Sequence, residues 1–116
     1  MATLDVSAQV HAYFEAWNRH DQDELKKTLS QHVKLTDWET SASGINSVLH
    51  ANAAIWSALP HIRINVVNIA ISQDSRTATC EINVELNDGS STILKVVDLL
   101  EFDSESKIIE VRAYKQ

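Results

Sequence analysis

Residues 93–102 have the sequence ILKVVDLLEF. β-Branched and other apolar residues fill this segment without glycine or proline, which predicts a β-strand. Side chains alternate across a strand. One face therefore carries Asp98 among four apolar residues, which are Leu94, Val96, Leu100 and Phe102. A carboxylate in apolar surroundings must be hydrogen-bonded, paired, or kept neutral by a raised pKa, so Asp98 is the first candidate for a functional group.

The composition predicts one globular domain over residues 1–116. Apolar residues make up 44% of the chain and charged residues 22%, which is typical of globular proteins. The formal net charge of -6 argues against nucleic acid or an anionic membrane as a partner, because both require basic surfaces. The single cysteine, Cys80, and the lack of a signal-peptide pattern or bilayer-length apolar run predict a cytoplasmic protein without a membrane segment.

Hydrophobic periodicity predicts three helices, which come early in the chain. The first ends near residues 18–20, the second follows an N-cap at Asp21, and the third ends before Pro60. A strand over residues 33–38 and a polar loop over 40–44 separate the second and third helices. Alternating apolar residues then predict four antiparallel strands, over residues 62–71, 78–86, 93–102 and 107–115.

The predicted element order is α-α-β-α-β-β-β-β. It indicates an α+β fold in which three N-terminal helices pack on one face of a curved, mostly antiparallel sheet. Apolar residues on the other face also need cover, and such a surface is typical of an interface. We therefore expect a homodimer packed through the sheet. Its contacts come from Val67, Ile69 and Ile71, or their neighbours in register, and from Ile93, Val97 and Leu99.

Three segments resemble one superfamily, and together they span nearly the whole chain. They are YFEAWNRHD at residues 13–21, VKLTD at 33–37, and VVDLLEF at 96–102 with its continuation to residue 114. They are similar to the first helix, first strand and final hairpin of the nuclear-transport-factor-2-like superfamily. This cone-shaped, cystatin-like fold includes SnoaL-like polyketide cyclases and ketosteroid isomerases. One fold of this kind hosts many chemistries, so the resemblance does not name a substrate.

The resemblance implies a cofactor-free acid/base site. In the isomerase pattern Asp37 is the general base, while Tyr13 and a protonated Asp98 donate hydrogen bonds to the developing enolate oxygen. The residues agree in part, because Asp37 shares a strand face with apolar residues and Tyr13 lies on the apolar face of the first helix. No histidine spacing suggests a metal site.

The sequence also departs from the isomerase pattern. Trp38 follows the predicted base where the isomerases have proline, and the third helix supplies Asn52 where they have a tyrosine. These differences favour a smaller or differently shaped apolar ligand. The residues expected to line its pocket are Phe14, Trp17, Trp38, Asn52 and Trp56.

Each catalytic assignment has a structural alternative. Tyr13 can be a core aromatic residue whose hydroxyl bonds Asp98, and Asp37 can simply cap the turn after its strand. Two functions therefore stay open. One is an isomerase, cyclase or dehydratase that acts on a small apolar carbonyl compound. The other is a non-catalytic dimer that binds a ligand or another protein.

Overall fold

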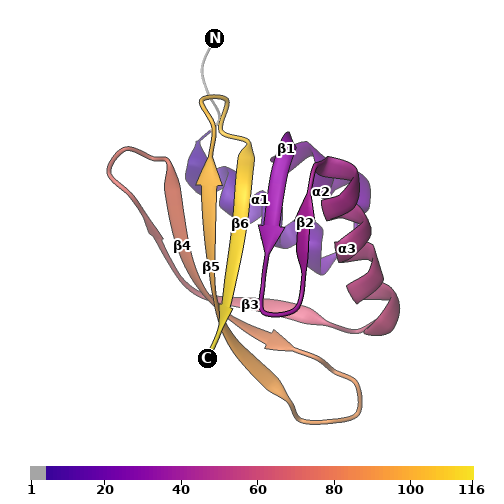
Figure 1. Cartoon of the computed structure of the whole chain (residues 1–116). Helices are drawn as coiled ribbons and strands as arrows, with labels where there is room; N and C mark the ends of the chain where they lie inside the picture. The colour runs from indigo at the N-terminus through magenta and orange to yellow at the C-terminus, as the bar shows by residue number, and fades with distance from the viewer. Residues whose placement is uncertain (1–4) are drawn as a thin grey trace.

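A computed structural model describes residues 5–116, which form three helices and a six-stranded sheet. The helices lie to one side of the curved sheet, where α1 passes behind it and α3 flanks its edge (Figure 1). This arrangement confirms the predicted α+β fold. The elements are α1 (Val6–Asn18), α2 (Gln22–Thr28), β1 (Leu29–Thr36), β2 (Ser41–Ser43), α3 (Ile45–Ala58), β3 (Arg63–Ile71), β4 (Thr77–Glu85), β5 (Ile93–Phe102) and β6 (Ile108–Lys115).

The strand order β2-β1-β6-β5-β4-β3 places β5 inside the sheet, between β6 and β4. β1 pairs with β6 in parallel, and the other neighbouring strands are antiparallel. The alternation predicted for β5 is confirmed, because Val96, Asp98, Leu100 and Phe102 are all buried. The helix-facing side of this strand therefore contributes one carboxyl group to an otherwise apolar core.

The predicted polar loop over residues 40–44 is wrong for Ser41–Ser43. These three residues form β2, which pairs antiparallel with the end of β1. A three-residue edge strand made of serine and alanine has too little apolar pattern to be seen in the sequence. Gly44 follows at a φ of +89° and leads into α3. Such a positive φ favours glycine.

Asn18 joins the end of α1 to the sheet. Its side-chain Nδ2 donates to the Ile64 carbonyl at 2.8 Å, and its Oδ1 accepts from the Ile64 backbone N–H at 2.7 Å. Ile64 lies on β3, an outermost strand of the sheet, so these bonds satisfy backbone groups that no neighbouring strand can reach. The clamp sets where α1 crosses the sheet and therefore where Tyr13 and Trp17 enter the interior.

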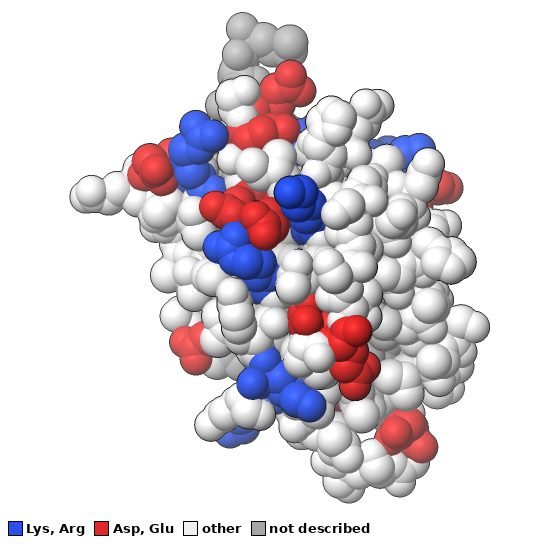
Figure 2. Space-filling view, viewed as in Figure 1, with Lys and Arg blue, Asp and Glu red and all other residues white. Residues whose placement is uncertain are grey.

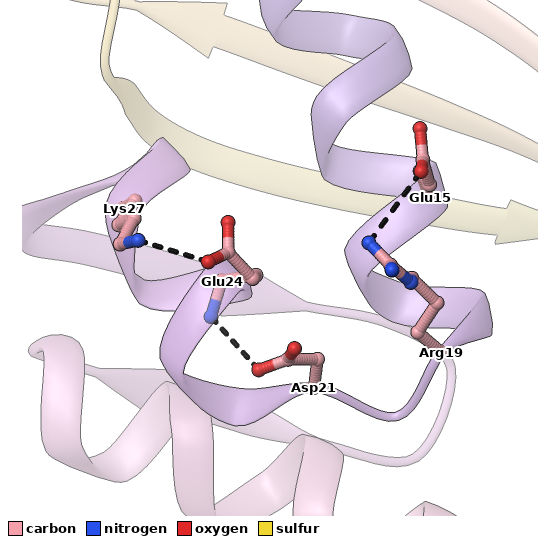
Figure 3. Close-up of polar contacts among 5 residues, drawn as sticks. All are labelled: Glu15, Arg19, Asp21, Glu24 and Lys27. Carbon is pink, nitrogen blue, oxygen red and sulfur yellow. Dashed lines mark hydrogen bonds and ion pairs between the residues drawn. The ribbon is translucent and has the colours of Figure 1, made fainter.

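The corner between α1 and α2 is organised by charged side chains (Figure 3). Asp21 Oδ1 accepts from the Glu24 backbone N–H at 3.0 Å, which confirms the predicted N-cap. The Glu24 carboxylate pairs with Lys27 at 2.8 Å instead of completing a capping box. Arg19 pairs with Glu15 one turn earlier on α1.

The sheet face turned away from the helices is partly apolar. Val67 is 60% exposed and Ile93 is 55% exposed. Of the two registers left open for Ile69 and Ile71, the structure has the one that turns them to the helix side. A β-bulge after Val66 shifts the register so that they pair with Cys80 and Ala78. The homodimer stays a prediction.

Charges of both signs are mixed over the face that carries β5 and β6, as Figure 2 shows. Arg112 bridges Glu101 at 2.6 Å and Glu110 at 3.1 Å on this face. Within residues 5–116, no helix is both long enough and apolar enough to cross a membrane.

We predict that Asn18→Ala lowers the free energy of unfolding by roughly 2 kcal/mol, because it leaves two backbone groups of Ile64 without partners. Urea unfolding followed by circular dichroism measures the loss. Asn46→Ala, at an exposed position of α3, is the matched control and should change stability little. Equal losses in the two variants would contradict the clamp.

Candidate functional site

A cavity of about 340 Å³ lies between α1, α3 and the sheet. This volume is at the lower end of the range for small-molecule sites. Tyr13, Asp37 and Asp98 all border it. Of the five residues predicted to line a ligand pocket, the structure places Trp17, Trp38 and Asn52 in the cavity wall, whereas Phe14 and Trp56 are buried outside it.

Asp98 projects into the buried part of this cavity from the middle of β5, and its side chain is only 5% exposed. Its partners on the neighbouring strands are Cys80 and Ala113, whose small side chains leave space around the carboxyl group. Burial raises the pKa of Asp98 to about 7, and the nearby carboxylate of Asp37 adds to the rise. Asp98 therefore holds its proton in a substantial fraction of molecules at neutral pH.

Tyr13 approaches Asp98 from α1. Burial raises the pKa of its hydroxyl well above the usual range, and the nearby Asp98 and Cys80 add smaller effects. The hydroxyl therefore stays protonated and can donate a hydrogen bond. Within residues 5–116, neither this hydroxyl nor the Asp98 carboxyl has a protein hydrogen-bond partner, and neither is sealed from the cavity. The hydrogen bond between the Tyr13 hydroxyl and Asp98, which was the structural alternative for this pair, is therefore not formed in the structure.

Asp37 follows the last residue of β1 and is half-buried at the cavity wall. Its Oδ1 accepts from the backbone N–H groups of Glu39 at 2.7 Å and Thr40 at 2.6 Å. The turn-capping alternative is therefore present in the structure. These bonds also fix the carboxylate in one orientation, and its Oδ2 accepts no bond from any residue in the described range. One aspartate can serve both as a cap and as a base.

The cavity side of α1 continues from Tyr13 to Trp17, one turn later. The Trp17 indole Nε1 donates to Asn52 Oδ1 at 2.9 Å, and Asn52 Nδ2 donates to the Val48 carbonyl at 2.9 Å. Asn52 thus supports Trp17 rather than Tyr13. Behind this pair, Trp56 stacks on His20 with ring centroids 5.2 Å apart.

Trp38 and Lys115 form one end of the cavity. Trp38 is 41% exposed, and the Lys115 ammonium group lies 5.3 Å from the centre of its indole ring. Lys115 and Glu39 are also exposed, so the cavity reaches the surface here. The sequence analysis missed Lys115, although alternation along β6 from Val111 through Ala113 places it on the same inward face.

Cys80 lies opposite Asp98 on β4 and is fully buried. Burial raises the pKa of its thiol to about 12, and Asp98 contributes a smaller rise. The thiol therefore stays neutral and contributes bulk, as a small apolar residue would. The described side chains around Asp98 provide two proton donors and one oriented carboxylate. Such a set suits the removal of a proton beside a carbonyl group, where negative charge develops on oxygen.

A family comparison agrees with this architecture. The model of a family described as a SnoaL-like domain matches residues 10–111, which is most of the chain. The chain belongs to the SnoaL-like domain family. This membership and the fold place it in the nuclear-transport-factor-2-like superfamily, as the sequence predicted. No curated protein matched the chain.

Several solved structures share the fold of this SnoaL-like domain at low sequence identity. A protein of unknown function with a cystatin-like fold from Methylobium petroleophilum PM1 has a TM-score of 0.86 at 14% identity, covering 99% of this chain and 78% of that one. A provisionally named ketosteroid isomerase from Kribbella flavida has a TM-score of 0.81 at 19% identity, covering 98% and 79%. A provisionally named polyketide cyclase from Sinorhizobium meliloti has a TM-score of 0.77 at 19% identity, covering 91% and 93%.

We predict that Asp98→Asn stabilises this SnoaL-like domain at pH 8 more than at pH 5. The pKa of Asp98 is higher in the folded protein, at about 7, than its ordinary value of 3.8. The folded state therefore binds the extra proton between these values, and wild-type stability falls as pH rises through about 7. The free energy of unfolding of the wild-type protein falls by about 1.4 kcal/mol for each pH unit between the two pKa values. The variant has no carboxyl group at this position and does not show this fall.

Urea unfolding at a series of pH values measures the difference. Asp23→Asn, at an exposed position of α2, controls for the removal of an aspartate and should show no comparable trend over this range. A stability difference between Asp98→Asn and wild type that is the same at pH 5 and pH 8 would contradict the raised pKa.

Proposed function

We propose that this SnoaL-like domain binds a small, largely apolar carbonyl compound in its cavity and catalyses a cofactor-free isomerisation, cyclisation or dehydration. Asp37 removes a proton from the carbon beside the carbonyl group. Tyr13 and protonated Asp98 donate hydrogen bonds to the enolate oxygen that develops. In an isomerisation Asp37 returns the proton to another carbon of the same molecule, and in a dehydration the proton goes to a departing hydroxyl group, which leaves as water. In a cyclisation the enolate carbon attacks a second carbonyl carbon of the same molecule, and the oxygen of that carbonyl takes the proton.

The observation that carries this proposal is the contrast between the two aspartates in one cavity. Asp98 is buried between small residues and keeps a raised pKa of about 7, whereas Asp37 accepts two backbone hydrogen bonds at the cavity wall. The two backbone bonds hold the Asp37 carboxyl group in one orientation, while burial favours the neutral form of Asp98. Environments that separate two carboxyl groups in this way assign one as the base and the other as a proton donor.

The names given to structural neighbours support the same class of chemistry. The neighbours from Kribbella flavida and Sinorhizobium meliloti carry the provisional names ketosteroid isomerase and polyketide cyclase. The cavity of about 340 Å³ and the bulk of Trp38 at its open end favour a compact substrate over a steroid. No metal or other cofactor is part of the proposed reaction.

A second candidate function is non-catalytic binding of the same class of ligand. The bonds from Glu39 and Thr40 to Asp37 favour it, because they give this aspartate a structural reason to be present. Tyr13 and Asp98 would then bind a carbonyl oxygen without a later proton transfer. The two candidates differ in what happens when the Asp37 carboxylate is neutralised.

We predict that the wild-type protein accelerates isomerisation of small cyclic β,γ-unsaturated ketones to their conjugated isomers, and that Asp37→Asn lowers the rate roughly 100-fold or more. Ultraviolet absorbance of the conjugated product measures the rate, and proton NMR in D₂O measures exchange beside the carbonyl group. Tyr13→Phe should also lower the rate, because it removes one donor to the enolate oxygen.

Asp103→Asn is the matched control. Asp103 Oδ1 accepts from the backbone N–H groups of Glu105 and Lys107 in a turn outside the cavity wall, as Asp37 does in its own turn. It should keep the full rate. Equal rates in the Asp37→Asn and Asp103→Asn proteins would reduce Asp37 to a turn cap. Ligand binding without any exchange would favour the non-catalytic function.

A further inference from the structure

Asn52 is a buried polar side chain in the cavity wall that the proposed proton transfer does not use. It lies on α3, it is only 5% exposed, and it borders the cavity. A carboxamide offers two N–H donors and one carbonyl acceptor. Here the carbonyl accepts from Trp17 Nε1, and one N–H donates to the Val48 carbonyl. The second N–H of Asn52 has no partner within residues 5–116.

The orientation of this amide is fixed by chemistry on both sides. The Trp17 indole N–H can only donate, so the oxygen of Asn52 must face it. The Val48 carbonyl can only accept, so the nitrogen must face α3. An inverted amide would place two donors together and two acceptors together. The free N–H is therefore held in place before any ligand arrives, which lowers the entropic cost of using it.

The position of Asn52 relative to the acid/base site follows from α1. Trp17 comes four residues after Tyr13 on the same helix face, which is a rise of about 6 Å along the axis. Asn52 contacts Trp17, so its amide borders the cavity on the side of Tyr13 that faces the C-terminal end of α1. Apolar residues, among them Ile64, Ile82 and Val96, line the same cavity as Tyr13 and Asn52.

The charges around the cavity limit the ligand further. Asp37, Glu39 and Asp98 border the cavity, whereas Lys115 is the one lysine or arginine among its described lining residues and lies against the Trp38 ring. A carboxylate or phosphate on the ligand would meet carboxyl groups at both the polar site and the open end. An uncharged ligand avoids this repulsion.

We propose that Asn52 is a second ligand anchor, and that the substrate is an uncharged carbonyl compound with a second oxygen acceptor apart from the reacting carbonyl. This inference rests on the proposed function, because it takes the reacting oxygen to lie between Tyr13 and Asp98. A hydroxyl, ether or second carbonyl oxygen would accept the free N–H. A purely apolar ligand would displace water from this donor and leave it unpaired.

A matched pair of phenols tests the anchor. The phenol hydroxyl stands in for the enolate oxygen at Tyr13 and Asp98, and the opposite end of the ring carries either an acceptor or none. 4-Methoxyphenol and 4-ethylphenol have nearly the same shape and differ by an ether oxygen in place of a methylene group. Isothermal titration calorimetry should show that the wild-type protein prefers 4-methoxyphenol by roughly tenfold.

Two variants separate the anchor from the support of Trp17. Asn52→Leu removes the donor and the Trp17 contact, and it should abolish the preference. Trp17→Phe removes the same contact but leaves the Asn52 amide bonded to the Val48 carbonyl, so it should retain a preference for 4-methoxyphenol. Retention of the preference in Asn52→Leu, or its loss in both variants, would overturn the anchor.

NMR of the Asn52 side-chain amide tests the anchor in the wild-type protein, so the test does not depend on whether a variant folds. 4-Methoxyphenol should shift the side-chain amide protons of Asn52 more than 4-ethylphenol does, and equal shifts would overturn the inference. Tyr13→Phe should weaken both phenols alike. If both phenols bind equally well and Tyr13→Phe weakens both, only the anchor is overturned. Failure of both phenols to bind, or binding indifferent to Tyr13, overturns the proposed function together with the anchor.

Discussion

The burial of the Asp98 carboxyl group is the constraint on which the rest of the site depends. A charged carboxylate loses much of its hydration in such a position, and the core residues on its own strand offer no compensating hydrogen bond. The structure meets this constraint with a raised pKa and with a cavity beside the carboxyl group, whose wall includes Ala113 on β6. The site therefore combines a cavity with an acid that holds its proton in a substantial fraction of molecules at neutral pH.

The second aspartate acquires a different character from its backbone surroundings. Asp37 lies where β1 ends, and the turn that follows points two N–H groups at one of its oxygens. The same turn carries Trp38, whose ring meets Lys115 at the end of β6. Local turn chemistry therefore orients the proposed base and also places the aromatic residue at the open end of the cavity. The parallel pairing of β1 with β6 brings these two segments together.

The sequence predicted those parts of the structure that depend on local periodicity. Alternation along residues 93–102 placed Asp98 inside, and helical spacing placed Tyr13, Trp17 and Asn52 on inward faces. It missed β2, because three small residues at an edge form a strand only through pairing with β1. It left the register of Ile69 and Ile71 open, because the bulge after Val66 is set by pairing with β4. It did not distinguish Trp56, which packs behind Trp17, from Trp38 at the cavity, because that difference depends on tertiary packing.

The measurement that tests this account most directly is a carbon-13 NMR titration of the Asp98 carboxyl group in the wild-type protein and in Asp37→Asn. The account predicts a midpoint near 7 in the wild-type protein and a lower midpoint in the variant, because the Asp37 charge is one of the two causes of the raised pKa. Titration of Asp98 near its ordinary value of 3.8 in both proteins would contradict the account. Asp98 would then be ionised at neutral pH and could not donate a hydrogen bond to an enolate oxygen.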